Sequence, residues 1–138
     1  MKSIFVQIAS YRDPELIPTI KDLIEKAHHP ENLKICIAHQ YAEEDEWDRL
    51  DQFAEDGRFI VIQIPHTEAQ GTCWARNQIQ QHYNGEDYTL HLDSHHRFIE
   101  GWDSECISTI ARLQKQGFKK PLLTSYCPAY HINKPIGL

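Results

Sequence analysis

The sequence lacks several features that would assign it at once to a class of protein. No stretch approaches the roughly 20 apolar residues that a membrane helix needs, and the apolar run at residues 4–9 is too short for a signal peptide. Positive charge is scarce, with 14 Lys and Arg against 20 Asp and Glu and a formal net charge of -6. Nucleic-acid binders neutralise phosphates with Lys and Arg. We therefore expect neither a membrane nor a nucleic acid as a partner.

Cysteine pairs and the common nucleotide-binding motifs are also missing. The four cysteines, Cys36, Cys73, Cys106 and Cys127, form no C-x-x-C pair, which argues against a cysteine-based zinc site. Because nothing else indicates secretion, we expect reduced thiols and a cytoplasmic protein. Neither G-x-G-x-x-G nor G-x-x-x-x-G-K-[ST] occurs, so dinucleotide-binding and P-loop chemistry lose support.

What the sequence does contain is an alternation of strand and helix patterns within a length of 138 residues, which fits one domain. Asp13, Pro14 and Glu15 predict a helix start, with Asp13 as the N-cap and Pro14 at the first helical position. Further helices are expected around Trp47 and Phe53, over 72–82 and over 102–113, and strands over 4–9, 33–38, 58–64, 88–93 and 121–126. This alternation predicts an α/β, Rossmann-like fold, a mostly parallel sheet with helices on both faces.

Three segments fall where ligands bind in such sheets, at the carboxyl ends of the strands. After the first strand, Tyr11 offers a flat face for a base, and Arg12 offers a fork suited to phosphate. The alternative is that Ser10 and Asp13 cap a helix while Tyr11 and Arg12 cover the sheet edge.

The second segment, residues 71–77, lies at a loop-to-helix junction. Gly71 permits close backbone approach, and a helix N-terminus presents unpaired N–H groups to an anion. Arg76 lies about one turn into this helix, within reach of a diphosphate or of a metal-binding carboxylate. The alternative is a plain turn at Gly71, a core Trp74 and a surface Arg76.

The third segment, residues 91–96, ends the fourth strand. Because strand side chains alternate, His91 and Asp93 should point the same way, with His95 beyond them. Asp93 supplies a hard oxygen and His95 an imidazole, a set that suits Mn²⁺ or Mg²⁺ with phosphate and water completing the shell. The alternative is a turn-forming Asp among solvated histidines.

Together, residues 4–14 (IFVQIASYRDP), 71–77 (GTCWARN) and 92–95 (LDSH) resemble, in the same order, the GlcNAc-transferase family of the Skp1-type enzyme. The resemblance runs from about residue 3 to residue 102. It implies the GT-A fold and transfer of N-acetylglucosamine from UDP-GlcNAc to a hydroxyl of a protein or glycan acceptor, such as hydroxyproline or threonine. GT-A enzymes usually continue with an acceptor-binding half, so we expect this fold to be incomplete at its C-terminus.

The resemblance also implies roles for individual residues. Asp93 and His95 would fill the role of the Asp-x-Asp motif, with His95 where many GT-A enzymes have a second Asp. Catalytic roles fall on Asp93, His95 and Arg76, and metal binding on Asp93 and His95. The nucleotide-binding set is Ser10, Tyr11, Arg12, Gly71, Ala75, Arg76, Asp93 and Ser94. The alternative functions are a metal-dependent hydrolase or phosphoesterase and a non-catalytic nucleotide-binding or interaction fragment.

Overall fold

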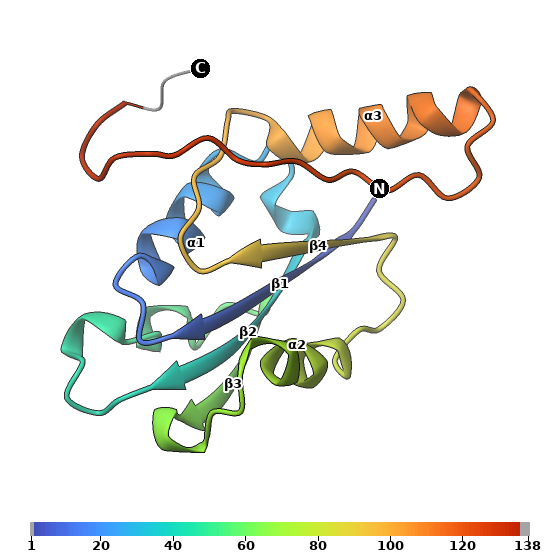
Figure 1. The fold of residues 1–138 in the computed structure, drawn as a ribbon. Coiled ribbons are helices and arrows are strands. Elements are labelled where there is room, and N and C mark those ends of the chain that lie inside the picture. The colour runs from blue at the N-terminus through green and yellow to red at the C-terminus, as the bar shows by residue number, and fades with distance from the viewer. Residues whose placement is uncertain (1, 136–138) are drawn as a thin grey trace.

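A computed structural model describes residues 2–135, and its centre is a sheet of four parallel strands (Figure 1). The strands are β1 (Ile4–Tyr11), β2 (Leu33–Tyr41), β3 (Phe59–Pro65) and β4 (Tyr88–Asp93), in the spatial order β3-β2-β1-β4. All three pairings are parallel. The expected α/β class with a parallel sheet is therefore confirmed, and this strand order is the Rossmann-like one.

Helices cover both faces of the sheet because the strand side chains alternate between the faces. Ile4, Val6 and Ile8 of β1 pack with α1 (Leu16–Glu25) and with the beginning of α3 (Trp102–Lys115). Phe5, on the opposite face, packs with α2 (Thr72–Gln80), whose Ile79 is fully buried. Figure 1 shows the resulting three layers, with α1 and α3 on one side of the sheet and α2 on the other.

Short 3-10 helices make up most of the remaining regular structure. They are η1 (Pro30–Asn32), η2 (Glu46–Asp48), η3 (Asp51–Phe53) and η4 (His66–Glu68). The α-helix expected around Trp47 and Phe53 is wrong, since η2 and η3 occupy that segment. Arg49, between the two short helices, has an extended backbone (φ -90°, ψ 124°), which interrupts a continuous helix. Within the described part of the chain, no helix is both long and apolar enough to span a bilayer.

Two further expectations are corrected. Helix α1 begins at Leu16 rather than at Pro14, because Pro14 and Glu15 form a turn in which the Asp13 carboxylate accepts the amide of Glu15 at 2.9 Å. Residues 121–126 form no strand; they belong to an extended segment that runs back from α3 across the molecule (Figure 1). Leu122 is 85% exposed there, and the short apolar run finds no partner strand with which to form a ladder.

Candidate functional site

The candidate site lies where the order of the strands reverses direction. β1 is followed along the chain by β2 and β3 on one side, whereas β4 lies on the other side. Loops leaving β1 and β4 therefore diverge at their carboxyl ends, and ligands of open α/β sheets bind in the resulting crevice. Asp93 ends β4 directly beside Ala9 of β1. The first and third sequence segments are thus brought together by strand pairing.

Asp93 and His91 point the same way, as the alternation along β4 predicted, and both contact α2. Arg76 of α2 donates a hydrogen bond to Nδ1 of His91 at 2.9 Å, and its other terminal nitrogen lies 3.4 Å from Oδ1 of Asp93. Burial, helped by the Arg76 charge, lowers the pKa of His91, which therefore stays neutral at pH 7 and accepts this bond. The Asp93 side chain remains 67% exposed, so its carboxylate is open to a ligand.

Asp13 joins the β1 loop to the β4 loop. Its Oδ2 accepts hydrogen bonds from the hydroxyl of Ser94 at 2.6 Å and from Nδ1 of His95 at 2.8 Å. Burial opposes ionisation of Asp13, but the hydrogen bonds from Ser94, the Glu15 amide and His95 outweigh it and lower the pKa of Asp13. Ser94, predicted to bind nucleotide, is buried and directs its hydroxyl at this carboxylate. His95 is 60% exposed.

Thr19 holds the turn that carries His95. This fully buried α1 residue accepts the amide of His96 at 2.9 Å, and its hydroxyl lies 3.1 Å from the carbonyl oxygens of both Ser94 and His96. Asp22 of the same helix accepts the amide of Phe98 at 2.6 Å. Residues 94–98 are therefore fastened to α1 by side-chain hydrogen bonds, and the position of His95 depends on them.

Tyr11 and Arg12 leave the end of β1 in different directions. Tyr11 is 54% exposed, and its ring meets the His66 ring edge-on with 6.3 Å between the ring centroids. Arg12 has a positive φ of 47° and binds Asp45 through two nitrogens, at 2.6 and 3.0 Å. Those bonds hold the pKa of Asp45 below its ordinary value. Asp45 is buried, because Arg12 draws this carboxylate inward.

Three other residues that were predicted to bind nucleotide lie near the carboxyl edge of the sheet but outside the cluster of Asp93, His95 and Arg76. Ser10 is 1% exposed, and its hydroxyl has no hydrogen-bond partner among the described residues. Gly71 has φ 95° and precedes α2 directly, a conformation that favours glycine. Ala75 is fully buried against Phe5 and Ile79. The structure therefore gathers Asp93, His95 and Arg76 but turns Ala75 into the core.

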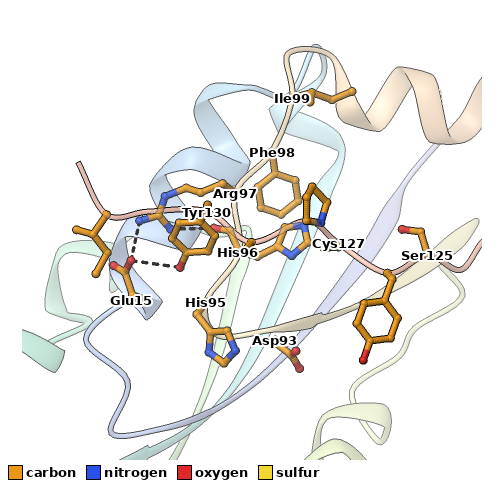
Figure 2. Close-up of a pocket in the computed structure, with 14 residues that line it drawn as sticks. Glu15, Asp93, His95, His96, Arg97, Phe98, Ile99, Ser125, Cys127 and Tyr130 are labelled. Atoms are coloured by element: carbon orange, nitrogen blue, oxygen red, sulfur yellow. Dashed lines mark hydrogen bonds and ion pairs between the residues drawn. The ribbon is translucent and has the colours of Figure 1, made fainter. Parts of the chain in front are cut away.

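Beside Asp93 and His95 opens a cavity of about 990 Å³, whose other wall is the extended C-terminal segment (Figure 2). Arg97 pairs with Glu15 at 3.1 Å and lies over the Tyr130 ring at 4.6 Å, and the Tyr130 hydroxyl donates to Glu15 at 3.2 Å. This three-residue contact fastens the segment to the domain. The full lining is Glu15, Asp93, His95, His96, Arg97, Phe98, Ile99, Ser125, Tyr126, Cys127, Pro128, Ala129, Tyr130 and Ile132.

The donor atoms at Asp93 and His95 suit a divalent cation. Among the described residues, no group of three or more His, Cys, Asp and Glu side chains is arranged to hold a metal ion. Asp93 and His95 would instead form a two-ligand site completed by phosphate oxygens and water. Because Nδ1 of His95 is bound to Asp13, its Nε2 is the nitrogen left for a cation. A carboxylate behind a histidine ligand is the usual arrangement around protein-bound metals.

Sequence reasoning missed Asp13 and the contact of Glu15, Arg97 and Tyr130. The sequence position of Asp13 indicated a site residue, since it follows a buried strand at the same edge as Asp93. Its interpretation as a helix cap left it out of the predicted site. Tyr130 lies 115 residues from its partner Glu15. No spacing pattern within the sequence connects residues so far apart.

Comparison with known protein families gives a match. The family model described as Glycosyltransferase (GlcNAc) matches residues 3–54 and 48–136, which together span nearly the whole described chain. Neither a curated protein nor a solved structure matches the chain. The matched residues include all the segments that meet at the carboxyl edge of the sheet. The chain belongs to the Glycosyltransferase (GlcNAc) family.

Proposed function

We propose that this chain is the nucleotide-sugar-binding part of a cytoplasmic GT-A transferase, which passes N-acetylglucosamine from UDP-GlcNAc to a hydroxyl of a protein or glycan acceptor. The family match supports a sugar-nucleotide donor and an acceptor. The observation that carries the residue assignment is the meeting of Asp93, His95 and Arg76 beside the end of β1. Uridine, N-acetylglucosamine and a hydroxyproline or threonine acceptor rest on the resemblance of the three motifs.

The donor would lie along the carboxyl edge of the sheet. Tyr11, which is 54% exposed, offers its ring to the base. Arg76, already 3.4 Å from the Asp93 carboxylate, supplies positive charge to the diphosphate. The cavity on the other side of Asp93 and His95 has room for the sugar and for the acceptor hydroxyl.

Asp93 and His95 would hold Mn²⁺ or Mg²⁺ between the protein and the diphosphate. Such a cation, when bound, stabilises the charge that accumulates on departing UDP. In the transfer, the acceptor oxygen bonds to the anomeric carbon, the bond from that carbon to the diphosphate breaks, and the acceptor proton passes to the departing UDP. The protein's contribution is to orient the two reactants, which converts a bimolecular encounter into a positioned one.

Thermal unfolding with UDP, UDP-GlcNAc or AMP, each with and without Mn²⁺, tests the proposal. A ligand that binds only the native state stabilises it by about 2.7 kcal/mol at 100 times its Kd. We expect Mn²⁺-dependent stabilisation by UDP and UDP-GlcNAc but not by AMP. Asp93→Asn should abolish it, whereas Asp51→Asn, the same change at an exposed carboxylate of η3, should leave it intact.

The outcomes separate the rival functions. Arg76→Ala should weaken UDP binding while the unliganded melting temperature stays near that of the wild type. Stabilisation that ignores uridine, or that survives Asp93→Asn, would defeat the proposal. Release of phosphate from a phosphoester without any acceptor would indicate a hydrolase instead.

A further inference from the structure

Asp13 makes two kinds of contact through its two carboxylate oxygens. Oδ1 accepts the Glu15 amide and closes the turn before α1. Oδ2 accepts from Ser94 and His95, which lie more than 80 residues away along the chain. The first contact is local and structural, whereas the second reaches into the candidate metal site.

The contact with His95 selects one form of the imidazole ring. An ionised carboxylate only accepts hydrogen bonds, so the 2.8 Å contact with Nδ1 requires the proton to be on Nδ1. In the neutral ring, Nε2 then carries the free lone pair. Histidine in water prefers the opposite tautomer, with the proton on Nε2, so the form that this contact requires depends on Asp13.

The same contact also fixes the orientation of the ring. Asp13 has a side chain only 17% exposed, whereas that of His95 is 60% exposed. Among the described residues, His95 makes no other side-chain hydrogen bond. A largely solvent-exposed ring is thus held by a single anchored carboxylate, and Figure 2 shows it beside Asp93 at the rim of the cavity.

We propose that Asp13 is the positioning residue of the metal site: its Oδ2 holds His95 as the Nδ1-protonated tautomer, with Nε2 directed to a divalent cation shared with Asp93. This inference rests on the proposed function. Carboxylates in this position typically raise metal affinity about 10- to 100-fold.

Asp13→Asn separates the two contacts. The amide oxygen can still accept the Glu15 N–H and preserve the turn. Its NH₂ group, placed at Oδ2, cannot accept from Nδ1–H but can donate to a bare Nδ1, which favours the other tautomer of His95. Asp22→Asn is the matched control, because Asp22 does not contact His95 and the amide oxygen of asparagine can still accept the Phe98 N–H that fastens the loop after β4 to α1.

Two measurements test the proposal. Long-range ¹H–¹⁵N NMR of histidine-labelled protein at pH 8 should show His95 protonated on Nδ1 in the wild type and in Asp22→Asn, and on Nε2 in Asp13→Asn. Titration of Mn²⁺ at fixed UDP should show that Asp13→Asn needs about 10- to 100-fold more metal for half-maximal binding, whereas Asp22→Asn should stay within about threefold of the wild type.

A wild-type ring protonated on Nε2 would overturn the inference even if Asp13→Asn did not fold. An unchanged Mn²⁺ requirement in folded Asp13→Asn would overturn it as well, while leaving the proposed function standing. Absence of any Mn²⁺-dependent UDP binding by the wild type would reject the proposed function, and this inference with it.

Discussion

Replacing Thr19 with valine should loosen the turn that carries His95. Thr19 is fully buried in α1, and its hydroxyl accepts the His96 amide at 2.9 Å. The same hydroxyl donates its single proton to the carbonyl oxygen of Ser94 or of His96, each 3.1 Å away. Valine has nearly the same shape, so the substitution removes the hydrogen bonds and leaves the surrounding packing in place.

The expected destabilisation follows from the groups left without partners. Two backbone groups, one N–H and one C=O, lose their hydrogen bond, and each such loss costs about 1–3 kcal/mol when the group is buried. Because the His96 amide is only partly buried, we expect a total in the lower part of that range, about 2–4 kcal/mol. At about 2.1 cal/mol/K of unfolding entropy per residue, this corresponds to a fall in melting temperature of roughly 7–14 °C for the 138 residues of the chain.

Urea unfolding followed by circular dichroism measures the change in the free energy of unfolding. Thr19→Ser is the control, because serine retains the hydroxyl and loses only a methyl group, at a cost of about 1 kcal/mol. The reasoning fails if Thr19→Val unfolds within 0.5 kcal/mol (roughly the error of such measurements) of the wild type, or if it is more stable than Thr19→Ser.

The remaining predictions concern pH and thiol reactivity. Burial opposes ionisation of Asp103, but the amides of His28 and His29 donate to its carboxylate and lower its pKa. The stability that ionised Asp103 contributes is therefore complete above the unfolded pKa of about 3.9 and is lost as pH falls through the lower folded pKa. Asp103→Asn should lose less stability than the wild type over that pH window in acid unfolding, and an identical profile would exclude this contribution. Burial also raises the pKa of Cys36 to about 12, so Ellman's reagent should modify the exposed Cys73 in the native protein and reach Cys36 only after unfolding; modification of native Cys36 would contradict its burial.

The fold class was predictable because burial imposes a period on the sequence. The strand at 88–93 was predicted with the bounds that the structure shows, since Leu90 and Leu92 alternate with polar residues. β1 and β2 extend beyond the predicted ends, to Tyr11 and Tyr41. Strand ends carry polar residues that resemble a loop in sequence, so periodicity alone ends a strand too early.

The candidate site was only partly predictable, because local sequence patterns report residue types and their periodicity but not tertiary contacts. Asp93, His95 and Arg76 were identifiable because their residue types are unusual at strand and helix ends. The partners of those residues were not, since Asp13 meets His95 only after β1 and β4 pair.

What the sequence by itself determined is the order of buried strands and amphipathic helices, and hence a parallel sheet with a chemically active carboxyl edge. These are consequences of local periodicity and of the connections between neighbouring elements. Only the tertiary structure decided which side chains share that edge. It bound Arg12 to Asp45, buried Ala75 and left residues 121–126 without a partner strand. Such contacts depend on where distant segments meet, and short-range sequence patterns do not predict those meeting points.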